Sequence, residues 1–288
     1  ESYKRVDLSE FGLSTENIKK IKRIVMVACG TAWHACLTAK FLIEKVARIP
    51  CEVDYASEFR YRDPILDEST LVLAISQSGE TADTVAAIEI ASKQTNTIAI
   101  CNVLGSTITR KVSHTLYTHA GPEISVASTK AFTTQLTAAY LLAIYLGQEK
   151  GTLTPDDVAK YISDIVKVPT AIDESLKLDS QIREVAKKYF KAKDFLFLGR
   201  GVLYPIALEG ALKLKEISYI HAEGYPAGEI KHGPISLIDE EMPIVVLLPK
   251  DEELYAKSLS NLREVESRGG KIIAITDTEK PEEVKQYA

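Results

Sequence analysis

A cluster of hydroxyl and amide side chains follows a short apolar run in this sequence, at a place where phosphate chemistry is possible. Residues 71–75 have the composition of a buried strand, and a helix-compatible segment begins after the cluster. The cluster contains Ser76, Gln77, Ser78, Gly79 and Thr81. The unpaired N–H groups and dipole of the following helix would point at the same place, so a phosphate fits there without a lysine. The alternative is an ordinary helix start, in which these side chains only cap the helix.

The motif around this loop limits the kind of phosphate that it binds. The loop lacks the lysine of the GxxxxGK[ST] motif, and no GxGxxG motif follows a strand. We therefore expect a small phosphorylated metabolite rather than a nucleotide.

A second set of ionisable residues lies on a helix expected over residues 205–219. Glu209, Lys213 and Glu216 share one face of it, at positions i, i+4 and i+7. This spacing is also that of a solvated salt-bridge ladder. The glycine-rich strand end at residues 198–201 favours a functional site, because doubly wound sheets bind ligands there. One carboxylate can carry a proton between adjacent sugar carbons while a lysine polarises the carbonyl group.

The histidines and cysteines have no metal-binding pattern. No H-x-x-x-H or C-x-x-C spacing occurs, so we expect neither a metal nor a cofactor. His34, His114 and His119 are expected to be structural or surface residues. His232 differs, because its KHGP context favours a tight, exposed turn.

Strand-length and helix-length segments alternate along the chain, which predicts parallel sheets covered on both faces. Strands are expected over residues 24–28, 52–55, 71–75, 97–101 and 115–117, and helices over residues 32–46, 81–93 and 128–146.

The same pattern returns in the second half of the chain. Residues 195–201 match residues 24–30, and the interval of 46 residues from Gly30 to Ser76 is repeated from Gly201 to Leu247. The sequence therefore predicts an α/β fold with two tandem doubly wound domains. In the second copy LLPKDE replaces SQSGET, and its acidic residues disfavour a phosphate there.

Four segments are expected from these patterns. They are a linker at residues 1–22, a first domain at 23–150, a helical linker at 151–182 and a second domain at 183–288. The second domain is expected to lack a final strand and helix, since only twelve residues follow Thr276. The first residue is Glu1 rather than methionine, which suggests a fragment of a longer chain.

The composition excludes several classes of protein. With 45% hydrophobic and 26% charged residues in 288, the chain is not disordered. The net charge of -5 disfavours nucleic acid and an anionic membrane as main partners, and no apolar run approaches the ~20 residues of a membrane span. The four cysteines lack C-x-x-C spacing and are expected to be buried free thiols of a reducing compartment, so a cytoplasmic location is expected.

Six segments together resemble one family, the isomerase half of the glutamine:fructose-6-phosphate aminotransferases, also called glucosamine-6-phosphate synthases. They are CGTAWHA (29–35), SQSGET (76–81), VASTKAFTTQL (126–136), FLGRG (197–201), EGALKLKEISYIHAE (209–223) and KHGP (231–234). SQSGET alone marks only the wider sugar-isomerase (SIS) fold, whereas the combination is specific. The resemblance covers essentially the whole chain.

The resemblance implies a set of residues that bind fructose 6-phosphate or glucosamine 6-phosphate. Its phosphate-binding residues correspond to Ser76, Gln77, Ser78 and Thr81. Thr31 would close the pocket, and Val126 and Ser128 would touch the sugar. Ala32 stands where some members have a phosphate-contacting serine.

The resemblance also implies catalytic roles and partners. Glu216 would be the proton-transferring base, Lys213 would assist at the carbonyl group and His232 would help to open the ring. In the family this histidine reaches the neighbouring subunit's site, so a homodimer is expected. The family's glutamine amidotransferase domain would precede this chain, and its C-terminal tail would follow Ala288.

Three functions remain possible at this point. The first is the isomerase and sugar-binding part of the enzyme that makes glucosamine 6-phosphate and glutamate from fructose 6-phosphate and glutamine. The second is a phosphosugar-binding SIS regulatory module, which needs SQSGET but not Glu216, Lys213 and His232 together. The third is a stand-alone sugar-phosphate isomerase.

Overall fold

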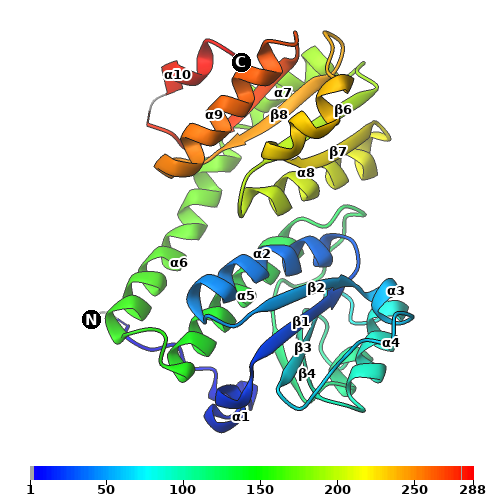
Figure 1. Cartoon of the computed structure of the whole chain (residues 1–288), viewed down its shortest axis with the longest axis vertical. Helices are drawn as coiled ribbons and strands as arrows, with labels where there is room; N and C mark the ends of the chain where they lie inside the picture. The colour runs from blue at the N-terminus through cyan, green and yellow to red at the C-terminus, as the bar shows by residue number, and fades with distance from the viewer. Residues whose placement is uncertain (1–2, 280) are drawn as a thin grey trace. The chain divides into compact units, whose positions relative to one another are not determined.

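Two parallel sheets form the cores of two compact units, and the chain passes from the first unit to the second after Ile172. The computed structural model describes residues 3–279 and 281–288. Figure 1 shows that each unit has helices on both faces of its sheet. The strand orders are β2-β1-β3-β4-β5 and β7-β6-β8-β9. The prediction of two tandem doubly wound α/β domains is confirmed.

The first unit contains the five strands that the sequence predicts. They are β1 (Arg23–Ala28), β2 (Cys51–Tyr55), β3 (Thr70–Ser76), β4 (Asn96–Cys101) and β5 (His114–Tyr117). Its helical elements are η1 (Ser9–Phe11), α1 (Thr15–Lys20), α2 (Thr31–Val46), α3 (Ala56–Phe59), α4 (Ala82–Ala91), η2 (Ile108–Arg110) and α5 (Lys130–Lys150), while α6 (Pro155–Leu176) crosses the boundary between the units.

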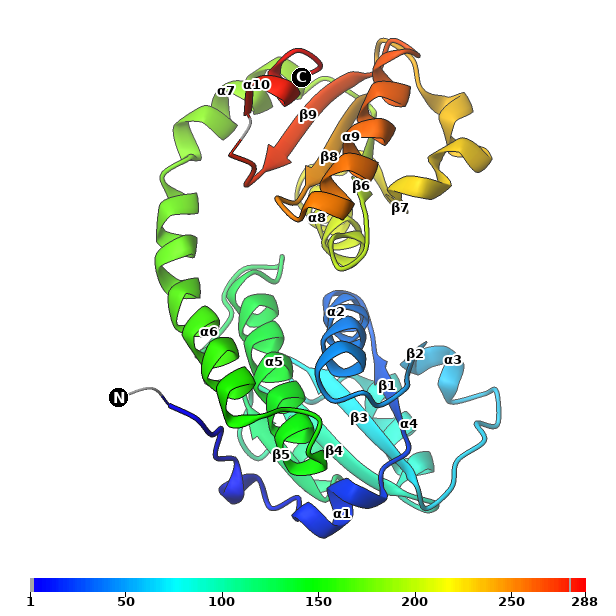
Figure 2. The ribbon, with the colours of Figure 1, turned by 60° about the vertical axis from the view of Figure 1, so that its left-hand side comes forward.

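Burial on both faces explains why these strands are continuous apolar runs. All seven residues of β3 are buried, which is typical of a central parallel strand. Val25 and Val27 pack with Phe59 and Ile88 on the face covered by α3 and α4. Side chains alternate along a strand, so Ile24, Met26 and Ala28 face α2 and α5, which lie together on the other side (Figure 2).

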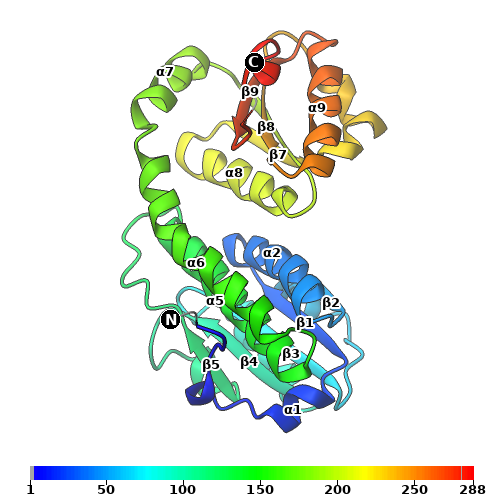
Figure 3. The same cartoon turned by 90° about the vertical axis from the view of Figure 1, so that its left-hand side faces the viewer.

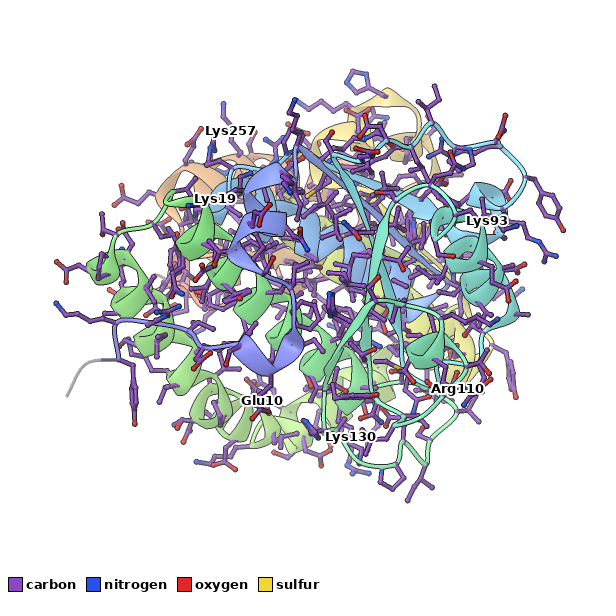
Figure 4. The ribbon with its side chains drawn as sticks, turned by 90° about the horizontal axis from the view of Figure 1, so that it is seen from below. Glu10, Lys19, Lys93, Arg110, Lys130 and Lys257 are labelled. Carbon is purple, nitrogen blue, oxygen red and sulfur yellow. The ribbon has the colours of Figure 1, made fainter. Side chains whose placement is uncertain are left out.

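The segment before β1 is fastened to α5. Figure 4 shows η1 and α1, which carry Glu10 and Lys19, crossing that helix. The Tyr145 hydroxyl donates to the Leu13 carbonyl at 3.2 Å, and the Gln148 side chain bonds both backbone groups of Val6. The segment therefore packs as part of the first unit.

The second unit repeats the arrangement with four strands (Figure 3). They are β6 (Asp194–Gly199), β7 (His221–Pro226), β8 (Pro243–Leu248) and β9 (Lys271–Thr276). Its helical elements are α7 (Asp179–Tyr189), α8 (Leu203–Ser218), η3 (Ala227–His232), η4 (Pro234–Leu237), α9 (Glu252–Glu266) and α10 (Pro281–Lys285).

Backbone details support the duplication. Gly30 and Gly201, which the sequence comparison pairs, both have φ of +56° at the turn from first strand to first helix. Strand β7 was not expected, because HAEGYP lacks an apolar run. It forms where Gly224 allows α8 to approach, and a Cβ there would lie 2.8 Å from the Leu208 Cα.

The region expected to be a helical linker is occupied by α6 and α7. Among the described residues, no helix is both long enough and apolar enough to cross a membrane.

Candidate functional site

The candidate site lies where the first sheet changes direction. Strands β1 and β3 are parallel neighbours. The chain leaves β1 for α2 on one face and leaves β3 for α4 on the other. This divergence opens a crevice at the carboxyl ends of the two strands, where doubly wound sheets bind ligands.

A cavity of about 180 Å³ occupies this crevice. Its lining residues are Cys29, Thr31, Ala32, Ile75, Ser76, Gln77, Ser78, Thr81, Thr84, Ser128 and Gln135. The volume corresponds to about six waters, which is room for a phosphate group. Six of the seven predicted binding residues line the cavity. Val126 does not, and it is 95% exposed.

The serine hydroxyls of the loop have hydrogen atoms available for an anion. Ser76 Oγ accepts the Gly79 N–H at 2.9 Å, and Ser78 Oγ accepts the Glu80 N–H at 3.2 Å. Because both oxygens act as acceptors in these bonds, each O–H remains able to donate. The loop is thus arranged as a set of donors around the cavity.

The start of α4 is not capped in the ordinary way. Thr81 occupies the N-cap position but makes no side-chain capping hydrogen bond. The Glu80 carboxylate accepts the Thr107 N–H at 2.8 Å instead, and the hydrogen bonds from Thr107 lower the pKa of Glu80. Thr81 therefore does not cap α4, and the N-terminal turn of α4 lines the cavity through Thr81 and Thr84.

Gly79 is the residue on which the loop conformation depends. Its φ is +67°, and a Cβ at this position would lie 2.0 Å from Ser106 Oγ. Its carbonyl accepts the Ile108 N–H at 3.0 Å. A side chain therefore conflicts with both the backbone conformation and the packing.

The segment that brings Ser128 to the cavity is held by residues that the sequence analysis did not identify. Glu123 accepts the N–H groups of Thr129 and Ala131, at 3.2 and 2.9 Å, and so caps α5. The Ala131 N–H is the main reason why the pKa of Glu123 is lowered. Glu123 lies six residues before the N-cap, outside the local spacing by which capping residues are recognised.

The second predicted cluster forms on α8. Lys213 Nζ lies 2.6 Å from Glu216 Oε2 and 3.3 Å from Glu209 Oε1. The Glu209 side chain is 7% exposed, whereas that of Glu216 is 31% exposed. One ammonium group thus lies between a buried carboxylate and a carboxylate that is partly open to solvent.

The predicted ring-opening residue lies in a different segment. His232 ends η3 with an exposed side chain. His34 is buried beside Trp33, and His114 packs on Phe11.

The cysteines are free thiols. Burial raises the pKa of Cys51 to about 12 and also raises the pKa of Cys36, so both are inert at neutral pH. Cys29 lines the cavity, 3.8 Å from the Thr84 hydroxyl. The described residues contain no group of His, Cys, Asp and Glu side chains that could hold a metal ion.

Comparison with known proteins gives consistent matches. The SIS domain family matches residues 17–145 and 188–285. Glutamine–fructose-6-phosphate aminotransferase (isomerizing) from Methanosarcina acetivorans is 52% identical over 281 residues, and that from Bacteroides thetaiotaomicron is 55% identical over 260. These alignments cover 97% and 90% of this chain but 45% and 42% of the relatives, so the chain spans less than half of their length.

A solved structure matches in both sequence and fold. The C-terminal domain of glucosamine-fructose-6-phosphate aminotransferase from Francisella tularensis superposes with a TM-score of 0.93 at 47% identity. The match covers 97% of this chain and 78% of that one.

Proposed function

Because this chain belongs to the SIS domain family, and within it to the isomerase part of the glucosamine-fructose-6-phosphate aminotransferases, we propose that it binds fructose 6-phosphate and isomerises the sugar. In the complete enzyme, an amidotransferase domain would supply ammonia from glutamine. The products would be glucosamine 6-phosphate and glutamate.

The observation that carries this proposal is that the cavity is lined by hydrogen-bond donors that remain available for a ligand. Ser76 and Ser78 keep their hydroxyl hydrogens, and Thr81 leaves the N-terminus of α4 uncapped. These groups suit the phosphate of the sugar, with Gln77 beside them and Thr31 across the cavity.

The charged cluster on α8 supplies the chemistry in this proposal. Glu216 takes a proton from one sugar carbon and returns it to the adjacent carbon, so the step needs no other reactant. Lys213, bonded to Glu216, stabilises the negative charge that develops on the carbonyl oxygen. A regulatory module that only binds the sugar phosphate does not need the pair of Lys213 and Glu216. The pair therefore favours an enzyme over a sensor.

Further features of the proposal rest on the family resemblance. Val126 would touch the sugar and His232 would help to open its ring from the neighbouring subunit, so the active form would be a homodimer. The four free cysteines support a cytoplasmic location.

Proton NMR of fructose 6-phosphate mixed with this chain tests the proposal. We expect glucose 6-phosphate to appear, and Glu216→Gln to slow its formation by about 10²–10⁴-fold. The matched control is Glu266→Gln, which replaces an exposed carboxylate at the end of α9. This variant should retain full turnover.

The same spectra report binding. The Glu216→Gln protein should still broaden the ligand lines, because the phosphate cavity is intact. Equal turnover in this variant would disprove the role of Glu216. Absence of both turnover and broadening with the unmodified chain would disprove the proposed function.

A further inference from the structure

One amide oxygen of a residue that lines the cavity is buried without a hydrogen-bond partner among the described residues. Gln135 lies in the second turn of α5 and is 2% exposed. Its neighbours on the buried face of the helix are Ala131, Phe132, Ala138 and Ala139. The Gln135 Oε1 atom accepts no hydrogen bond from any described residue. An unpaired amide oxygen in such a place is destabilising, so a functional reason is expected.

The Gln135 side chain lines the phosphate cavity, and it is not alone there. The Ser128 hydroxyl, just before α5, is also buried, and no partner for it occurs within the described ranges. The cavity therefore has two walls of different character. The β3–α4 wall, from Ser76 to Thr84, and the α5 wall, from Ser128 to Gln135, face the same space.

The two walls suit different parts of one ligand. The β3–α4 wall offers hydroxyl hydrogens and helix N–H groups, which bind phosphate oxygens. The Gln135 carbonyl oxygen can only accept a hydrogen bond, so it would repel an ionised phosphate oxygen. It requires a donor, and a sugar phosphate has donors in the hydroxyl groups on its carbon chain.

We propose that Gln135 accepts a hydrogen bond from a ligand hydroxyl close to the phosphate ester, and that it makes the cavity selective for phosphate esters of polyols over simple phosphates. This inference rests on the proposed function, because it assigns a role within the same site. Ser128, which can donate and accept, completes the hydroxyl-binding wall.

The test is calorimetric titration of the chain with three ligands. Glycerol 3-phosphate carries a hydroxyl on the carbon beside the ester, as does fructose 6-phosphate in its open-chain form, whereas ethyl phosphate does not. The Gln135→Met variant keeps the length and volume of the side chain but removes the amide. We expect it to bind the two hydroxylated ligands about tenfold more weakly, which corresponds to about 1.4 kcal/mol, and ethyl phosphate unchanged.

Each other result is informative. An equal loss for all three ligands would mean that Gln135 contacts the phosphate or only supports the fold, and would overturn the inference. Unchanged binding of all three would mean that a water alone satisfies the carbonyl oxygen, and would overturn it as well. If the unmodified chain binds none of the ligands, the proposed function itself fails.

A measurement on the unmodified chain avoids the risk that the variant does not fold. With ¹⁵N-labelled glutamine, the side-chain amide resonance of Gln135 should shift with glycerol 3-phosphate much more than with ethyl phosphate. Equal shifts would overturn the inference. Retained binding of ethyl phosphate is the folding control for Gln135→Met.

Discussion

The hydroxyl groups of the 76–81 loop leave hydrogen-bond donors available in the cavity. Ser78 accepts a backbone N–H and keeps its own hydrogen, and Thr81 does not cap the helix that it precedes. A phosphate bound there gains charge-assisted hydrogen bonds without replacing any internal bond. This is why a loop without a lysine can serve as an anion site.

Removing two of these hydroxyls should weaken binding but leave the fold intact. Ser78→Ala combined with Thr81→Ala is expected to cost about 2 kcal/mol of phosphosugar binding energy, or about 30-fold in Kd, measured by calorimetric titration. Ser92→Ala, at the opposite end of α4, is the matched control and should bind normally. Unchanged affinity of the double variant would refute the phosphate assignment.

At the scale of elements, the strand-to-helix turns decide whether the site exists. The β3–α4 turn requires Gly79, because its φ lies in the left-handed region and because a side chain there would overlap Ser106. The start of α5 requires Glu123, which fixes the segment that carries Ser128.

A matched pair of glycine variants separates backbone strain from packing. Gly79 and Gly105 have nearly the same φ, +67° and +66°, but a Cβ at Gly105 would meet no atom within 4 Å. Gly105→Ala should therefore lose only about 1 kcal/mol of unfolding free energy. Gly79→Ala should lose clearly more and should also lose phosphosugar binding. Equal stabilities in urea unfolding would show that the contact with Ser106 does not matter.

The cap on α5 gives the first unit a pH-dependent contribution to stability. Because hydrogen bonds from Ala131 and Thr129 lower the pKa of folded Glu123, its ionised form stabilises the fold above the ordinary glutamate pKa of about 4.3. This contribution falls as the pH drops through the lowered pKa. Glu123→Gln should thus be less stable at pH 7 by about 1 kcal/mol, and the difference should shrink as the pH falls through the lowered pKa of Glu123. A difference that does not depend on pH would exclude charge as the cause.

At the scale of the whole molecule, the proposed function places phosphate binding in the first unit and proton transfer in the second. Each unit has its own sheet and its own core. Ligand binding stabilises the unit that contains the site, because the ligand binds its folded state and not its unfolded state.

Inorganic phosphate should therefore stabilise the first unit selectively. Trp33 is the only tryptophan of the chain and stacks on Tyr55 within that unit, so its fluorescence reports unfolding there. Phosphate at about 100 times its Kd should add about 2.7 kcal/mol to the unfolding free energy of this unit, and circular dichroism should show a second transition that does not move. Equal shifts of both transitions would contradict the assignment.

The sequence by itself determined the duplicated α/β fold and the location of both clusters. Buried parallel strands must be apolar runs, and helical spacing must place Glu209, Lys213 and Glu216 on one face, so local pattern was sufficient for both. The sequence did not reveal β7, because an edge strand beside a closely packed helix is built from small and polar residues rather than an apolar run.

Only the tertiary structure decided how the cavity is completed. Gln135 and Glu123 lie in segments that no local spacing connects to SQSGET, and Gln135 reads from the sequence as one polar residue in a long apolar helix. Gln135 lines the cavity beside this loop, and Glu123 holds the start of α5. Both follow from the packing of α5 against the sheet beside the crevice between β1 and β3. Contacts of this kind depend on how distant elements pack, which local residue patterns do not encode.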